Sequence, residues 1–144
     1  MALNRSTAEL LIGSSSSDIY RLSLEQGRFM KSMQSGCPAI NTMSLCERTQ
    51  ILLSGGEDGG LEVWDTRART IAGRIEIKPD SDASDDEFDG GLVGGVAEAA
   101  GQGITALEWS NDCVSFAVGD SNGRALMFDI RSTKPVFTKQ MPVR

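Results

Sequence analysis

Histidine is absent from this 144-residue chain. No Ser–His or Cys–His pair can therefore form, and such pairs carry much of the nucleophilic catalysis in proteins. The chain also lacks an apolar run of about eighteen residues, the length that predicts a membrane-spanning helix. Its N-terminal stretch, MALNRSTAELLIG, has neither the long apolar core nor the cleavage site of a signal peptide. We therefore expect an intracellular protein that is not an enzyme.

Cysteine is also scarce. Cys37, Cys46 and Cys113 show no CxxC spacing, which argues against a metal or redox motif. In strand or turn contexts, small thiols usually occupy buried positions. We expect all three cysteines to be buried or half-buried thiols in a reducing compartment.

Cofactor and metal motifs are missing as well. The glycine-rich segments GGEDGG and DGGLVGG lack the Lys-Ser/Thr pair of a phosphate loop and do not lead into a convincing helix. The acidic run from Asp80 has no glycine at the sixth position of a calcium loop, and Gly91 stands where the bidentate glutamate should be. We expect no cofactor and no metal.

The net charge of −6 comes from one segment. Six acids lie within ten residues, and the rest of the chain holds 14 acidic and 14 basic residues: the six are Asp80, Asp82, Asp85, Asp86, Glu87 and Asp89. Phosphate neutralisation needs clustered Lys and Arg, so the overall charge makes the isolated chain a poor nucleic-acid binder.

Residues 53–67, LSGGEDGGLEVWDTR, read as strand, tight turn and strand. Asp58-Gly59 is a hairpin turn signal, because these residues tolerate a positive φ. The hairpin closes on Trp64-Asp65, the dipeptide that marks one blade of a WD-repeat propeller.

Two further copies support a repeat. In residues 117–131, Gly119, Asn122, Phe128 and Asp129 take the places of Gly55, Asp58, Trp64 and Asp65. A weaker copy, residues 11–24, has Gly13 in the same register. The three glycines are 42 and 64 residues apart, and the first spacing fits the WD-repeat period of about 40–45 residues. The second spacing predicts an insertion.

The sequence therefore predicts an all-β chain, an incomplete WD-repeat propeller of about two and a half four-stranded blades. We expect a partial blade at 8–36, a blade at 37–79, a disordered acidic and Gly-rich loop at 80–103 with a short helical turn at 96–100, and a blade at 104–144. Candidate strands are 8–13, 19–24, 29–33, 40–45, 50–54, 61–65, 70–77, 104–109, 114–118, 125–129 and 136–139.

This number of blades cannot close a ring, since propellers close with typically four to eight. Either the chain is a piece of a longer protein, or several copies assemble. Both terminal blades would expose sheet faces and edges that neighbouring blades should cover. We therefore expect the isolated chain to self-associate.

Several stretches resemble one family. Residues 19–22 and 24–29, IYRL and LEQGRF, resemble the YRLNLEQGRF stretch of the nucleolar protein ten family, called Enp-two in yeast. EVWDTR at 62–67 is similar to that family's VEVWDPR or VECWDPR. ITAL at 104–107, FAVG at 116–119, LMFDIR at 126–131 and Lys134-Pro135 resemble its ISALKF, MAVG and LLYDLRSDKP. The LEQGRF stretch is the specific part, because WD-type hairpins occur in many unrelated propellers.

The resemblance implies a nucleolar factor in small-subunit ribosome assembly and pre-ribosomal RNA processing. It implies a non-catalytic scaffold that contacts other assembly proteins, and RNA as a further candidate partner, inside a large ribonucleoprotein. Family members carry further blades on both sides of this stretch and a basic helical tail. The alternative is a generic WD-repeat adaptor in another complex, of the ubiquitin-ligase or chromatin type.

Most candidate site residues have a structural interpretation. Trp64 and Phe128 could bind a partner, but their repeat register favours packing inside a blade. Asp65 and Asp129 end their strands, which favours hydrogen bonding within a turn over catalysis. Asp58 and Asn122 are turn formers, in the same register as the glycines of each repeat.

Two sets of residues keep a functional interpretation. Arg67, Arg69 and Arg74 form a basic group that could contact RNA phosphate or an acidic partner, the alternative being scattered solvated arginines. Ser81 and Ser84 lie in the acidic run, where an acid-directed kinase would find them suitable. The alternative for these serines is an unmodified solvating loop.

Overall fold

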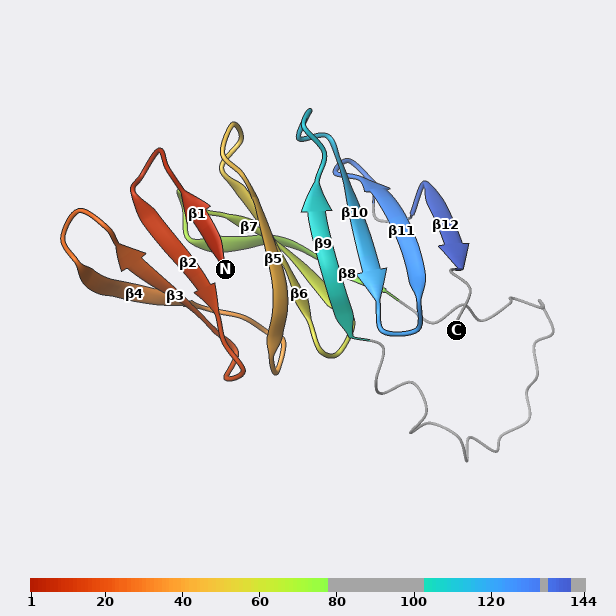
Figure 1. The fold of residues 1–144 in the computed structure, drawn as a ribbon, viewed down its shortest axis with the longest axis horizontal. Helices are drawn as coiled ribbons and strands as arrows, with labels where there is room; N and C mark the ends of the chain where they lie inside the picture. The colour runs from red at the N-terminus through yellow and green to blue at the C-terminus, as the bar shows by residue number, and fades with distance from the viewer. Residues whose placement is uncertain (78–102, 133–134, 141–144) are drawn as a thin grey trace.

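The computed structural model describes residues 1–77, 103–132 and 135–140. Three four-stranded antiparallel sheets make up these residues (Figure 1). The first sheet contains β1 (Ala2–Asn4), β2 (Glu9–Gly13), β3 (Asp18–Ser23) and β4 (Arg28–Gln34). The second contains β5 (Ile40–Cys46), β6 (Ile51–Gly56), β7 (Gly60–Asp65) and β8 (Thr70–Glu76). The third contains β9 (Ile104–Trp109), β10 (Ser115–Asp120), β11 (Arg124–Asp129) and β12 (Phe137–Gln140).

The sheets are arranged like successive blades of a propeller. Within each sheet the strands lie in chain order, so that every connection is a hairpin. The first strands of the three sheets are neighbours, because β5 contacts both β1 and β9. Figure 1 shows the three sheets fanning out around these inner strands. The predicted all-β, open propeller is confirmed, and no described helix is long and apolar enough to cross a membrane.

The first blade has four strands, where the sequence predicted a partial blade. The additional strand is β1, whose Ala2 and Asn4 pair with Leu11 and Glu9 of β2. Three residues are too few to show strand alternation, so this element gave no sequence signal. The other strands start and end within one or two residues of their predicted bounds. The predicted insertion and its helical turn lie outside the described residues, except for Gly103.

Apolar cores fill both spaces between the sheets. Adjacent residues of β6 point to opposite faces, so Leu52 joins one core and Leu53 the other. The core between the first two sheets contains Leu11, Ile19, Met33, Ile40, Met43, Leu52 and Trp64. The core between the second and third contains Leu53, Leu61, Ile104, Leu107, Trp109, Phe116, Val118, Leu126 and Phe128, among others. β6 and β7 are therefore buried on both faces, which explains the continuous apolar run at residues 51–53, whereas β8 is largely exposed.

Two of the repeat glycines allow close packing between blades. A Cβ added at Gly13 would lie 2.7 Å from Cγ2 of Ile40, at the start of the second blade. A Cβ added at Gly55 would lie 2.5 Å from Cγ2 of Ile104, at the start of the third. Real Cβ atoms do not approach another atom so closely. The glycine of each blade therefore leaves room for the first isoleucine of the next.

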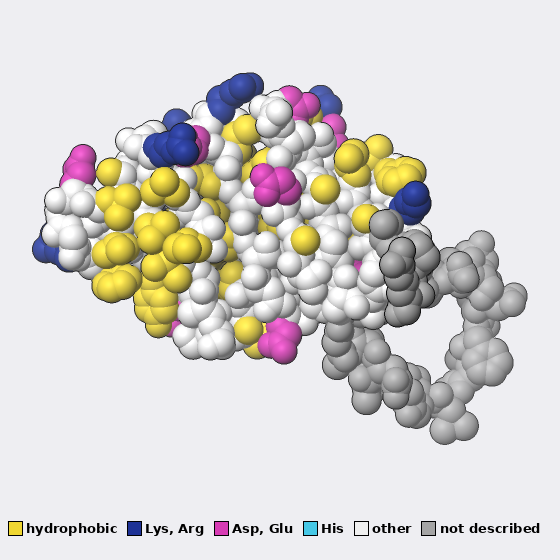
Figure 2. Space-filling view, viewed as in Figure 1, with side chains coloured by type: hydrophobic (Ala, Val, Ile, Leu, Met, Phe, Trp, Pro, Cys, Tyr) yellow, Lys and Arg dark blue, Asp and Glu magenta, His cyan; other side chains and the backbone are white. Residues whose placement is uncertain are grey.

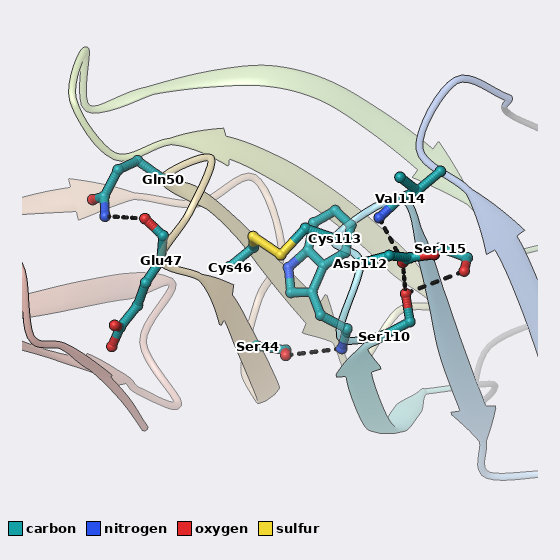
Figure 3. The surroundings of a disulfide bond; sticks show 10 residues. Ser44, Cys46, Glu47, Gln50, Ser110, Asp112, Cys113, Val114 and Ser115 are labelled. Carbon is teal, nitrogen blue, oxygen red and sulfur yellow. Dashed lines mark hydrogen bonds between the residues drawn. A yellow bond between two sulfur atoms is a disulfide. The ribbon is translucent and has the colours of Figure 1, made fainter.

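The cysteine expectation is wrong for two of the three residues. Cys46, at the end of β5, forms a disulfide with Cys113 in the β9–β10 turn (Figure 3). The bond joins the second blade to the third across a sequence separation of 67 residues. Only the packing of the blades brings these residues together, so their spacing gave no signal. Cys37 is a buried free thiol, as expected.

Replacing Gly55 by alanine should destabilise the fold. The new methyl group would overlap Ile104 of the next blade, and overpacking of this kind costs about 1–3 kcal/mol. Gly73→Ala is the matched control, because an added Cβ there has no atom within 4 Å. Urea unfolding should give a lower free energy of unfolding for Gly55→Ala and an unchanged or higher one for Gly73→Ala. Equal values for the two variants would contradict the close-packing interpretation.

Reduction of the Cys46–Cys113 bond should lower the melting temperature. The chain-entropy model gives a stabilisation of about 4 kcal/mol for a loop of this length. We expect dithiothreitol to lower the melting temperature of the chain and of a Cys37→Ser control. It should leave that of Cys46→Ser unchanged. A melting temperature of the unaltered chain that does not respond to dithiothreitol would argue against the bond.

Candidate functional site

The strand-ending aspartates are built into turns. One carboxylate oxygen of Asp65 accepts hydrogen bonds from the backbone N–H groups of Arg67 at 3.0 Å and Ala68 at 3.3 Å. Asp129 likewise accepts from the backbone of Arg131 at 2.9 Å and pairs with its guanidinium at 2.9 Å. These hydrogen bonds from Arg131 lower the pKa of Asp129 to about 2. Both carboxylates are engaged in local structure rather than arranged as an acid–base pair.

The repeat aromatics lie in the cores between the blades. Trp64 is 2% exposed, and its indole N–H donates to the hydroxyl of Ser54 at 3.0 Å. This bond satisfies the indole without a histidine nearby. Phe128 is 1% exposed and stacks on Phe116 with 5.3 Å between the ring centroids. A partner could not reach either residue without separating the blades.

The hairpin turn residues also have structural contacts. Asp58 accepts a hydrogen bond from the backbone of Gly60 at 3.0 Å, and the carbonyl of Asn122 accepts one from the side chain of Gln140 at 2.9 Å.

Gly119 differs from the other repeat glycines. An added Cβ there would meet only side chains of its own sheet, Ala106 at 3.4 Å and Thr105 at 3.9 Å. This face of the third sheet is therefore open.

The predicted basic group is divided by the structure. Arg74 lies within β8, where it pairs with Asp58 at 3.2 Å and with Glu62 at 3.3 Å. Glu62 is fully buried and also accepts a hydrogen bond from the hydroxyl of Ser35. Arg74 thus neutralises an acidic cluster that holds the β4–β5 connection against the second sheet. Arg67 and Arg69 are exposed in the β7–β8 turn, away from this cluster.

Cys37 lies beside the same cluster. Burial, with a smaller contribution from the charge of Glu62, raises the pKa of its thiol to about 11. The thiol therefore stays protonated at neutral pH and is a poor nucleophile or metal ligand. No group of metal-ligating side chains occurs within 1–77, 103–132 and 135–140. Ser81 and Ser84 lie outside these described ranges, and their phosphorylation remains a prediction.

Gln50 organises three turns, a role that sequence reasoning missed. Its side chain is 4% exposed, and its amide N–H₂ donates to Ser6 in the β1–β2 turn at 2.9 Å and to the Glu47 carbonyl at 2.8 Å, the latter drawn in Figure 3. Its carbonyl oxygen accepts from Asn4 at 2.7 Å and from Thr66 in the β7–β8 turn at 3.0 Å. A polar residue in a polar turn carries no signal of such a role.

The open face of the first sheet holds an apolar groove. Its volume is about 400 Å³, and it is lined by Ile12, Tyr20, Phe29, Met30 and Ser32. Tyr20 and Phe29 meet edge to face with 6.3 Å between their ring centroids. Figure 2 shows hydrophobic side chains gathered on this side of the molecule. The exposed face is consistent with the expected self-association, which stays a prediction.

Comparisons with known proteins agree with this architecture. A family model described as the nucleolar protein 10-like N-terminal domain matches residues 1–143. The chain is 32% identical to nucleolar protein 10 of Xenopus laevis, over 92% of this chain and 18% of that protein. It is 31% identical to the ribosome biogenesis protein enp2 homolog of Schizosaccharomyces pombe, over 94% of this chain and 22% of that protein. Saccharomyces cerevisiae ribosome biogenesis protein ENP2 is 27% identical, over 96% and 17%.

The chain spans about a fifth of the length of these curated relatives. Among solved structures, a chain in the crystal structure of the mitotic checkpoint complex aligns with a TM-score of 0.72 at 19% identity. The alignment covers 96% of this chain and 35% of that chain, and at this identity it concerns the fold alone. Because the family model matches nearly every residue, this chain belongs to the nucleolar protein 10-like N-terminal domain family.

Proposed function

We propose that this chain is a non-catalytic scaffold segment in a nucleolar particle that assembles the small ribosomal subunit and processes its precursor RNA. The observation that carries the proposal is that relatives named as nucleolar or ribosome biogenesis proteins match 92–96% of the chain. Their names indicate the nucleolus as its location. A scaffold acts by binding, so its function depends on surfaces that neighbouring molecules can cover.

The apolar groove of the first sheet is such a surface. It is formed largely by the β3–β4 hairpin, which contains the LEQGRF stretch. Phe29 of this stretch is 63% exposed and Tyr20 is 40% exposed. Contiguous exposed apolar surface usually marks an interaction site. Phe29, the last residue of the stretch with the most specific family resemblance, therefore also lines the exposed groove.

An adaptor role in a ubiquitin-ligase or chromatin complex is the alternative. The mitotic checkpoint structure does not favour it, because its 19% identity supports only the shared fold. The relatives that match nearly the whole chain are named for the nucleolus and for ribosome biogenesis. The particle with which the chain sediments in cells distinguishes the two roles.

Replacing Phe29 by aspartate should release the chain from pre-ribosomal particles. A charge in the groove would have to be buried against an apolar surface, which we expect to weaken binding by about tenfold or more. Leu24→Asp is the matched control, since Leu24 is 51% exposed and does not line the groove. Sucrose gradients of cells that express each tagged variant give the fraction that co-sediments with small-subunit precursor RNA.

The proposal predicts that the unaltered chain and Leu24→Asp co-sediment with these particles and that Phe29→Asp does not. If the unaltered chain is instead recovered with ubiquitin-ligase or chromatin subunits and without ribosomal precursors, the adaptor role replaces the proposed one. Equal co-sedimentation of all three proteins would show that the groove does not bind the particle.

A further inference from the structure

Three strand arginines have carboxylate partners: Arg21 pairs with Glu9, Arg74 with Asp58 and Glu62, and Arg124 with Asp120. The exposed Arg28 at the start of β4 donates to the side chain of Gln26 instead. Within the part of the chain that the structure describes, no ion pair joins a carboxylate to any of four exposed arginines: Arg5, Arg48, Arg67 and Arg69. These four lie in the β1–β2, β5–β6 and β7–β8 turns.

These three turns are the ones that Gln50 fastens together. Its buried amide bonds to Ser6, to the carbonyl of Glu47 and to Thr66, one from each turn. The four arginines therefore lie in three turns that one side chain joins, and we call them the arginine turns (Arg5, Arg48, Arg67 and Arg69). Figure 2 shows Lys and Arg side chains along the upper edge of the molecule, where the β5–β6 turn lies in Figure 1.

Nearby acids leave the guanidiniums free. Glu47 accepts a hydrogen bond from the backbone N–H of Arg5 at 3.2 Å. Asp65 accepts from the backbone N–H groups of Arg67 at 3.0 Å and Ala68 at 3.3 Å. Both carboxylates thus bind main chain and hold the turns in shape. The side chains of the arginine turns are exposed, and within 1–77, 103–132 and 135–140 no carboxylate pairs with them.

Hydroxyl side chains accompany each arginine. The turns read Arg5-Ser6-Thr7, Arg48-Thr49 and TRART at residues 66–70. Phosphate oxygens accept hydrogen bonds from guanidinium, hydroxyl and backbone N–H groups alike. An acidic protein segment would also meet the charge, but protein interfaces depend on buried apolar or aromatic anchors. Arg67 and Arg69 are separated by Ala68, and no aromatic residue lies within the three turns, so the surface suits a phosphate backbone better.

We propose that the arginine turns bind the phosphate backbone of RNA. The proposal rests on the function proposed above and names RNA as one partner of the scaffold. Arginine suits this role because its planar guanidinium can donate two hydrogen bonds to one phosphate. Contacts of this kind read no base sequence, so binding should be independent of sequence and strongly dependent on salt.

Fluorescence anisotropy with a labelled single-stranded RNA of mixed sequence tests the surface. The test variant is R5Q/R48Q/R67Q, which removes one charge from each turn. On single strands each phosphate contact contributes about 0.7 to the slope of log affinity against log salt. Four contacts predict a slope of about −3 for the unaltered chain, and the variant should have a slope of about −1 and bind more weakly at low salt.

The control variant is R28Q/K31Q/K139Q. It removes the same number of charges from exposed positions on β4 and β12, outside the arginine turns. We expect it to keep the slope and most of the affinity of the unaltered chain. Equal losses in the two variants would show that only the net charge matters and would overturn the proposal. Binding by R5Q/R48Q/R67Q like that of the unaltered chain would also overturn it.

Three further experiments test this interpretation. T66V changes no charge but removes the hydrogen bond that Thr66 donates to Gln50. Because this bond fixes the β7–β8 turn against the other two turns, T66V should weaken RNA binding several-fold. Far-UV circular dichroism and melting curves verify that each variant folds. Labelled polyglutamate replaces RNA in a parallel titration. If it binds as tightly and loses the same affinity in R5Q/R48Q/R67Q, the surface binds acidic protein segments and the RNA assignment is wrong.

Failure of this proposal can be told apart from failure of the proposed function. Suppose that R5Q/R48Q/R67Q loses RNA binding in solution, but the unaltered chain sediments without pre-ribosomal particles. That result would support RNA binding by the arginine turns and contradict the proposed scaffold function. If the unaltered chain sediments with the particles while RNA affinity is the same in test and control variants, the scaffold function is supported and RNA binding by the arginine turns is contradicted.

Discussion

The packing of one blade's first isoleucine against the preceding blade's glycine is the constraint on which the structure depends. Ile104 Cγ2 lies 2.5 Å from where a Cβ on Gly55 would be, and Ile40 stands in the same relation to Gly13. This spacing brings the sheets close enough for Trp64 and Phe128 to be almost fully buried between them. The repeated glycine is therefore a packing requirement between blades as well as a feature of each hairpin.

At both interfaces, the end of one blade's first strand is also bonded to the first turn of the next blade. The bond is a hydrogen bond at one interface and a disulfide at the other. From the end of β1, Asn4 bonds to Gln50 in the first turn of the next blade. From the end of β5, Cys46 forms a disulfide with Cys113 in the first turn of the third. The side-chain amide of Gln50 has further donors and acceptors beyond its bond to Asn4. It can therefore also bond to Ser6 in the β1–β2 turn and to Thr66 in the β7–β8 turn. The connection between the three turns that carry the exposed arginines follows from that choice of residue.

The charge of the whole chain and the charge of one surface lead to different conclusions. A net charge of −6 argues against nucleic-acid binding, yet the acids responsible lie mostly between residues 80 and 89. Over the described strands, acidic groups pair with Arg21, Arg74 and Arg124. Among the described residues, four exposed arginines without such a partner lie in turns: Arg5, Arg48, Arg67 and Arg69. Because screening limits exposed charges to about 10 Å, the local arrangement decides which ligands a surface attracts.

The sequence alone determined the fold class, the hairpins and the family, because a turn signal such as Asp58-Gly59 and strand alternation are local patterns. Repeated at a fixed spacing, they specify blades. The tertiary structure alone decided the contacts between distant residues. It paired Cys46 with Cys113, separated Arg74 from Arg67 and made Gln50 a hub. It also added β1, a strand too short to show a pattern. These outcomes depend on how blades pack, and side chains brought together only by packing leave no periodic trace in the sequence.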